Sequence, residues 1–107
     1  MESAGTQSAS GAPGPAAENT EQAINFLGYW LLTNQRYEHA IAVFELNTES
    51  YPESANAWDS LAEGHLRRGD RDRAAELYRK SLGLDPDNGN AKKKLESLGA
   101  ETADKAE

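Results

Sequence analysis

The sequence predicts an all-α fold, a superhelix (solenoid) of two helix hairpins followed by a C-terminal capping helix. The first observation behind this prediction is an internal repeat with a spacing of 34 residues, a period typical of stacked helix–turn–helix units. The second is that apolar residues in each unit recur at helical spacing, with turn-forming residues between the runs. The matched positions are Ile24, Leu27, Gly28, Ala40, Phe44 and Pro52 in the first unit, and Trp58, Leu61, Ala62, Ala74, Tyr78 and Pro86 in the second.

Residues 1–20 precede the repeat and contain no aromatic residue and no Ile, Leu or Val. They carry too little apolar surface to offset the entropy of ordering, so we expect a disordered lead or linker. This segment lacks the basic start and the apolar run of a secretory signal, and no stretch of the chain reaches the length of a membrane span. A cytoplasmic location and no contact with a membrane are therefore expected.

The first repeat unit is predicted over residues 21–54. Its first helix runs from Glu21 to Leu32, and the residues Thr33 to Gln35 interrupt the apolar pattern. The second helix runs from Tyr37 to about Thr48 and ends before Pro52, because the residue before a proline is pushed out of helical geometry. The apolar stripe of the first helix comprises Ala23, Ile24, Leu27, Trp30 and Leu31.

The second repeat unit is predicted over residues 55–88. Ser54 is a good N-cap for a helix from Ala55 to Arg68, and Gly69 can take the positive φ that ends it. Asp70 is expected to cap the next helix, over 71–84, which Pro86 closes.

A capping helix is predicted over residues 89–99, with Gly99 as its end and residues 100–107 as a disordered tail. Thr20, Ser54 and Asn88 share one phase of the repeat, and all three are capping types. Two repeat positions that are expected in the core of the first two units carry polar residues in this third helix. Lys92 stands at the position of Ile24 and Trp58, and Glu96 stands at the position of Gly28 and Ala62. A polar outer face is what a terminal repeat requires.

With these residues in place, the chain resembles the tetratricopeptide repeat family over residues 21–99. The second unit fits the pattern of that family closely, and the first fits it with one weaker position. Leu31 and His65 stand where the family usually has Tyr, and Gln35 stands where the second unit has Gly69. A narrower resemblance links residues 27–63 to the repeat tails of some bacterial serine hydrolases. The chain has no nucleophile motif of the G-x-S-x-G or S-x-x-K type, so a catalytic domain would lie elsewhere.

The sequence contains no constellation that would support catalysis. Cysteine is absent, and His39 and His65 stand on different helices without metal-ligand spacing. We therefore expect a non-enzymatic protein with no cofactor and no metal. The net charge of −7 is a poor match for a phosphate backbone, and acids interleave the arginines of the second unit. Nucleic acid is accordingly not an expected partner.

The family resemblance implies that a peptide or a partner protein lies along a concave groove made by the first helix of each unit. The residues expected to contact it are Asn25, Tyr29, Asn56, Asp59, Glu63 and Lys93. Some family members clamp acidic peptide ends there, but this chain matches that clamp poorly, with Lys94 as the reasonable match. Asp59 and Glu63 would give the groove an acidic centre suited to a peptide that carries a base.

Three aromatic residues lie together on a flank of the first helix: Phe26, Tyr29 and Trp30. Their counterparts in the second unit are Ser60, Glu63 and Gly64. One explanation is that Phe26 and Trp30 fill the space over the small Ser60 and Gly64. The other is that they cover an open surface that meets a partner, a fused domain or a second copy of the chain.

Two functions therefore remain open at this stage. The leading hypothesis is a protein-interaction module that presents its groove to a peptide. The alternative is an oligomerisation or accessory tail module of a hydrolase, which self-associates through Phe26 and Trp30.

Overall fold

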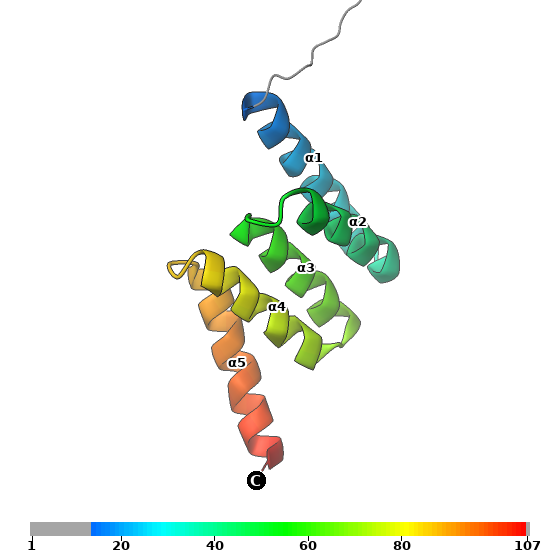
Figure 1. Ribbon diagram of the computed structural model, residues 1–107. Coiled ribbons are helices and arrows are strands. Elements are labelled where there is room, and N and C mark those ends of the chain that lie inside the picture. Colours follow the sequence, from blue (N-terminus) through cyan, green and yellow to red (C-terminus); the bar gives the residue numbers. More distant parts are fainter. Residues whose placement is uncertain (1–13, 107) are drawn as a thin grey trace, which may run out of the picture.

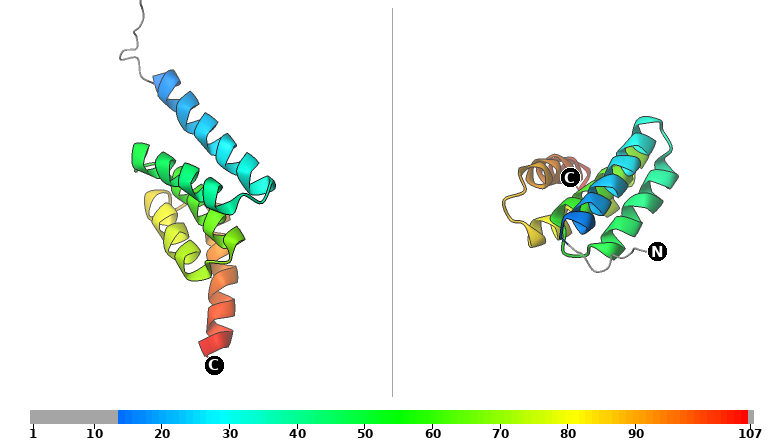
Figure 2. Two further views of the ribbon diagram at one scale, coloured as in Figure 1. Left: turned by 90° about the vertical axis from the view of Figure 1, so that its right-hand side faces the viewer. Right: turned by 90° about the horizontal axis from the view of Figure 1, so that it is seen from above.

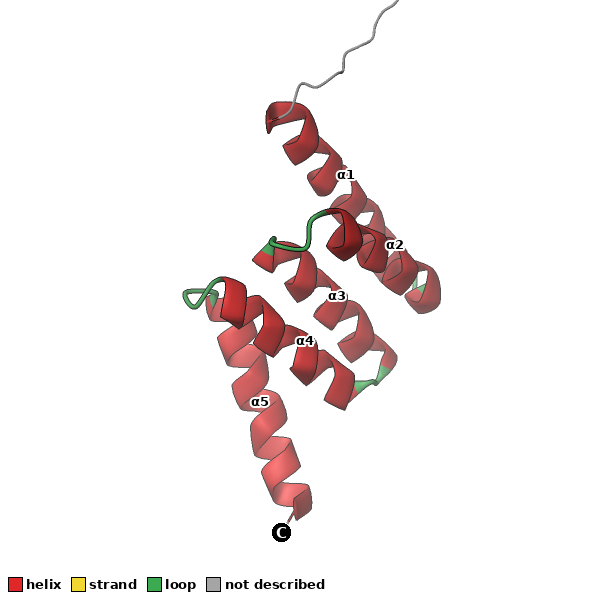
Figure 3. Cartoon of the chain, viewed as in Figure 1, coloured by secondary structure: helices red, strands yellow, loops and turns green. Residues whose placement is uncertain are grey.

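A computed structural model describes residues 14–106 of the chain, with side chains over residues 20–99. Within these residues every regular element is an α-helix (Figure 3). The helices follow one another as α1 (Gly14–Thr33), α2 (Tyr37–Ser50), α3 (Ala55–Arg68), α4 (Arg71–Leu84) and α5 (Gly89–Ala106). Each helix packs against the next one in sequence, and α1 also contacts α3. The result is the predicted superhelix, in which α1–α2 and α3–α4 are hairpins and α5 lies against α4 (Figures 1 and 2).

The helix α1 begins at Gly14, earlier than the start near Glu21 that the sequence predicts. Residues 14–20 are thus helical rather than part of a disordered lead, and residues 1–13 lie outside the described part. Pro15 near the first position and the helix formers Ala16, Ala17 and Glu18 suit such a start. Thr20, expected as an N-cap, accordingly lies inside α1.

The turns of the two hairpins share one geometry. In the second turn Gly69 has a φ of 103°, and the amide of Asp70 donates to the carbonyl of His65 at 2.8 Å. In the first turn Gln35 has a φ of 63°, and the amide of Arg36 donates to the carbonyl of Leu31 at 2.8 Å. The repeat therefore imposes a left-handed residue at both positions, and only the second one is a glycine.

Replacing Gln35 with glycine should raise the free energy of unfolding by about 0.5–1 kcal/mol, because glycine adopts a positive φ without the clash of a Cβ. Urea unfolding followed by circular dichroism measures the change. The matched control is Gly69→Gln, which should lower stability by a similar amount. A Gln35→Gly variant less stable than the parent chain would contradict this reading of the turn.

The expectation for Asp70 is wrong in one respect. Asp70 stands at the N-cap of α4, but its side chain makes no cap hydrogen bond. Its carboxylate instead accepts from Nε of Arg68 at 2.8 Å, and its Oδ2 lies 3.1 Å from Nδ1 of the buried His65. Hydrogen bonds from His65 and then from Arg68 lower the pKa of Asp70. The carboxylate thus ties the end of α3 to the turn, whereas Ser54 caps α3 as predicted, since its Oγ accepts from the amide of Ala57 at 3.1 Å.

The core runs through the stack as one cluster, with the fully buried rings of Phe44 and Tyr78 at equivalent positions of the two hairpins. The half-buried Trp58 packs against this cluster. The buried polar residues also follow the repeat. Asn47 of α2 donates to the carbonyl of Glu21 at 3.2 Å, and Ser81 of α4 donates to the carbonyl of Ala55 at 2.7 Å. The positions of both donors and of both acceptors differ by one repeat length.

The helix α5 continues to Ala106 instead of ending at Gly99. Among residues 14–106 the glycine with a positive φ is Gly69, so Gly99 has no left-handed geometry that would stop a helix. The expected polar outer face is present, since Lys92 and Glu96 are both exposed. The capping helix is therefore longer than predicted.

The buried face of α1 is narrower than the sequence predicts. Ile24 and Leu31 are half-buried, but Ala23, Leu27 and Trp30 are exposed. The corresponding residues of α3, which are Ala57, Leu61 and Gly64, are all buried. The physical reason is that α2, the preceding helix, packs against this side of α3, whereas no described helix packs against the equivalent side of α1.

Candidate partner-binding face

The first helices of the stack present one polar face, which we call the first-helix face. It consists of Asn25 and Tyr29 of α1, Asn56, Asp59, Glu63 and Arg67 of α3, and Asn90, Lys93 and Lys94 of α5. On α1 and α3 these residues stand three or four positions apart, and on α5 Lys93 and Lys94 stand three and four positions after Asn90, which places them on one side. Hydrogen bonds from Asn90 to Asp59 and an ion pair between Lys94 and Glu63 connect α3 and α5 across it.

Asp59 is nearly buried, and its carboxylate accepts from two side chains that follow α4. Asn90 Nδ2 donates to Oδ1 at 2.9 Å, and Asn88 Nδ2 donates to Oδ2 at 2.9 Å. Asn88 also donates to Oγ of Ser81 at 2.9 Å, while its Oδ1 accepts from the amide of Ala91 at 3.2 Å. Asp59 is thus a structural group that fixes the start of α5 on α3.

Glu63 lies at the centre of a second network, formed with Arg67, Tyr78 and Lys94. Its Oε2 accepts from Nε of Arg67 at 2.9 Å, and its Oε1 accepts from the hydroxyl of Tyr78 at 3.0 Å. Nζ of Lys94 lies 3.4 Å from the same Oε1. Burial alone would raise the pKa of Glu63, but the bonds from Arg67 and Tyr78 and the charge of Lys94 lower it overall. Burial and this carboxylate raise the pKa of Tyr78, which keeps its hydroxyl a donor.

The stability of the chain should therefore depend on the protonation of Glu63. Its folded pKa lies below the ordinary value of 4.5, so the carboxylate stabilises the fold at pH above that value, and this contribution disappears as the pH falls through the folded pKa. We expect Glu63→Gln to lose about 0.5–1 kcal/mol at pH 7, after allowance for solvent screening of its half-exposed partner Arg67. The variant should also lose less stability than the parent chain between pH 6 and pH 3.

Urea unfolding at several pH values measures this effect. Glu45→Gln, which changes an exposed carboxylate of α2, is the matched control and should leave the pH dependence unaltered. Equal pH slopes for Glu63→Gln and the parent chain would contradict the assignment.

Tyr29 occupies in the first hairpin the position that Glu63 occupies in the second. Its ring meets the ring of Phe44 edge-on, with the centroids 5.2 Å apart. Burial raises the pKa of Tyr29, an effect that a hydrogen bond with Ser60 of α3 partly offsets. The pair Tyr29–Phe44 is therefore the apolar equivalent of the hydrogen-bonded pair Glu63–Tyr78.

The structure brings three of the expected contact residues together, namely Tyr29, Asp59 and Glu63. Asn56 and Lys93 are exposed at the margin of the same face. Asn25 is half-buried, and its Oδ1 has no hydrogen-bond partner within the described chain. The sequence reasoning missed the parts played by Asn88 and Tyr78. The part played by Tyr78 could have been found in the sequence, because the pair Tyr29–Phe44 of the first repeat is replaced by the pair Glu63–Tyr78 in the second.

The charges of the face differ from the expected acidic centre. Both carboxylates are engaged by side chains of the chain itself, and the Glu63 side chain is only 12% exposed. The charged groups of the face that reach solvent are cationic, with Arg67 49% and Lys94 35% exposed, and Lys93 is exposed as well. The face therefore has no free carboxylate that would attract a basic peptide, and the acidic centre expected from the sequence does not support binding of such a peptide.

The aromatic flank of α1 is open. Phe26 is 72% and Trp30 is 54% exposed, so the first of the two explanations, that they fill the space over Ser60 and Gly64, is wrong. That space is occupied by α2, because a Cβ at Gly64 would lie 3.1 Å from Ile41 and 3.2 Å from Phe44.

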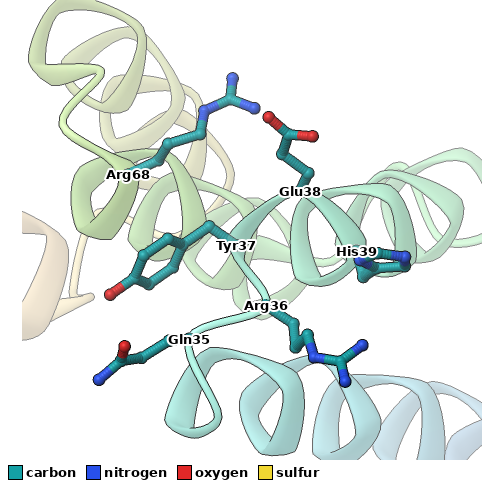
Figure 4. A pocket seen from close by; sticks show the side chains of 6 residues that line it. All are labelled: Gln35, Arg36, Tyr37, Glu38, His39 and Arg68. Carbon is teal, nitrogen blue, oxygen red and sulfur yellow. The ribbon is translucent and has the colours of Figure 1, made fainter.

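An open pocket lies at the start of α2, lined by Gln35, Arg36, Tyr37, Glu38, His39 and Arg68 (Figure 4). Its side chains do not converge on a common point, and Arg68 is paired with Asp70. In the described residues no group of His, Cys, Asp and Glu side chains could hold a metal ion. Among these residues there is also no helix with the length and apolar character to cross a membrane.

The comparison with known families agrees with this geometry. Residues 57–92, which span most of α3, all of α4 and the start of α5, match the model of the tetratricopeptide repeat. This part of the chain therefore resembles the tetratricopeptide repeat, a family of helical repeats. Proteins of this class generally serve as protein-interaction modules and are generally non-catalytic. A search of curated proteins finds no match for the chain.

Proposed function

We propose that the chain is a protein-interaction module that binds a peptide segment of a partner protein on the first-helix face. The observation that supports this proposal most is the composition of the face. Its two carboxylates are already engaged inside the chain, while the polar groups of Asn56, Arg67 and Lys93 remain exposed to solvent. A rigid surface with exposed hydrogen-bond donors suits the binding of a peptide segment whose carbonyl or carboxylate oxygens accept hydrogen bonds.

In this proposal the expected residues have different roles. Tyr29, Asn56, Glu63 and Lys93 contact the partner segment. Asn25 and Asp59 lie deeper and shape the floor of the face. The solvent-exposed charges are positive, so the partner segment is neutral or acidic rather than basic.

Binding of labelled peptides to the full chain tests this proposal. Three fluorescein-labelled peptides of equal length, one acidic, one neutral and one basic, are titrated by fluorescence anisotropy. The acidic peptide should bind most tightly and lose affinity as the salt concentration rises. The variant Arg67→Gln/Lys93→Gln should weaken its binding about tenfold.

The matched control is Arg79→Gln/Lys92→Gln, which removes two exposed positive charges that lie outside the first-helix face. It should leave the affinity within about twofold of the parent chain. Preferential binding of the basic peptide, or equal losses in the two double variants, would count against this face.

The role of an accessory module of a hydrolase stays a prediction. It requires a catalytic domain that is not part of residues 1–107.

A further inference from the structure

The exposed large hydrophobic side chains of the described chain all belong to the first hairpin. They are Phe26, Leu27 and Trp30 of α1 and Leu46 of α2. Phe26 and Leu27 stand three and four positions after the exposed Ala23, and Trp30 stands three positions after Leu27, so these residues form a continuous stripe. We call Ala23, Phe26, Leu27 and Trp30 the α1 stripe. Its opposite side packs against α2 and α3, so α1 is apolar on both sides.

A continuous apolar stripe that stays exposed marks a surface that meets a partner. The repeat shows how the equivalent stripes are covered in this chain. On α3 the equivalent residues Ala57, Ser60, Leu61 and Gly64 are all buried, with α2 lying against them. On α5 the equivalent residues Ala91 and Leu98 are buried and Lys94 and Leu95 are half-buried, with α4 lying against this helix. The α1 stripe therefore lies at the position where α3 and α5 each contact the helix that precedes them.

The sequence of the chain narrows the choice of occupant. Residues 1–13 contain no aromatic residue and no Ile, Leu or Val, so they offer no apolar stripe of their own. The opposite end of the stack shows the polar Lys92 and Glu96, which do not match an apolar surface. In a second copy of the chain, the surface that does match is its own α1 stripe.

Charge and size also favour a second copy. Residues 22–35 contain no charged side chain, so two copies can meet there without like-charge repulsion despite the net charge of −7. In an antiparallel pair centred between Phe26 and Leu27, the small Ala23 of one copy lies opposite the large Trp30 of the other. Such alternation of small and large residues is what close helix packing needs. A pair of this kind closes on itself and does not propagate into filaments.

We infer that the chain forms a symmetric dimer through antiparallel pairing of the α1 stripes of two copies. The dimer leaves the first-helix faces of both copies available and does not depend on peptide binding. The stripe is small, so the dimer dissociates at low concentration, as expected for interfaces below about 1,200 Å².

Sedimentation and light scattering of the full chain over about 1–300 µM test the inference. The mass should rise from 11.6 kDa towards twice that value. The variant Phe26→Lys/Trp30→Gln should raise the dissociation constant at least about a hundredfold while the helical circular dichroism is retained. Lysine at position 26 copies Lys94, its equivalent on α5. The control Ala42→Lys adds the same charge to an exposed position of α2 and should keep the dimer.

Cross-linking tests the antiparallel register. The chain contains no cysteine, so single introduced cysteines report cleanly. Leu27→Cys lies near the two-fold axis and should form a disulfide with its own copy. Ala23→Cys should not cross-link with itself, but a mixture of Ala23→Cys and Trp30→Cys should cross-link.

A chain that stays monomeric at the highest concentration overturns the inference. So does a dimer that survives Phe26→Lys/Trp30→Gln, or a strong Ala23→Cys homodimer, which would indicate parallel pairing. The dimer and the peptide site are tested separately. The peptide affinity should not fall in Phe26→Lys/Trp30→Gln, and the dimer should be unchanged in Arg67→Gln/Lys93→Gln.

Discussion

Replacing Gly28 with alanine should lower the free energy of unfolding by about 3 kcal/mol. A Cβ at this position would lie 2.2 Å from Cε1 of Phe44 and 2.6 Å from its Cδ1 and Cζ. The ring has no room to retreat, because its other edge faces α3, where a Cβ at Gly64 would lie 3.2 Å from Cδ2. Phe44 is completely buried between the two glycines, so the added methyl group must push α1 away from α2. Urea unfolding followed by circular dichroism measures the loss.

Gly83→Ala is the matched control for this prediction. Gly83 lies in α4, and a Cβ there would have no neighbouring atom within 4 Å. Alanine has the higher helix propensity, so this variant should gain up to about 1 kcal/mol. A second mutation, Phe44→Leu, should recover part of the loss in Gly28→Ala, because a smaller side chain gives back the space. If Gly28→Ala and Gly83→Ala behaved alike, the close approach of α1 and α2 would be refuted.

Replacing Asn88 with alanine should lower the free energy of unfolding by about 2–4 kcal/mol. The side chain has three tasks, since it caps α5 through the amide of Ala91 and donates to both Asp59 and Ser81. Loss of the cap accounts for about 1 kcal/mol, and a buried carboxylate that loses a donor accounts for about 1–3 kcal/mol more. The effect should be concentrated in α5, because stacked repeats depend mainly on their neighbours.

Asn88→Ser separates the two contributions. Serine caps α3 at the equivalent position 54, so this variant should keep the cap and lose only the bonds to Asp59 and Ser81. Its loss of stability should be about half to three quarters of that of Asn88→Ala. Hydrogen exchange should show faster opening of α5 than of α1 and α2 in both variants. A uniform change along the chain would mean that Asn88 does not act by fixing α5.

Local signals in the sequence predicted most of the helix boundaries. The ends of α3 and α4 follow directly from Ser54, Gly69 and Pro86, because caps, left-handed residues and prolines act within a few bonds. Two boundaries were wrong because the local signals there are weak. The segment before Thr20 has helix formers but few apolar residues, and Gly99 is tolerated inside a helix at a cost of about 1 kcal/mol.

The candidate site was only partly predictable. The spacing within each helix places Tyr29, Asp59 and Glu63 on one side of the stack. It does not reveal that Asn88 reaches Asp59 or that Tyr78 reaches Glu63, because those contacts join residues that are 29 and 15 positions apart. The sequence suggested an acidic site, whereas the structure shows carboxylates that are already engaged.

The repeat, its period and the class of fold could be predicted from the amino-acid sequence, because helical spacing and capping residues are local properties that recur every 34 residues. Which side of each helix is covered became clear from the packing of the helices. Leu27 and Leu61 are equivalent in sequence, yet Leu27 is 47% exposed and Leu61 is 3% exposed. The difference arises because α2 lies in front of α3 and no described helix lies in front of α1. Burial depends on the neighbour in space, and that neighbour is not encoded in the residue or in its helix.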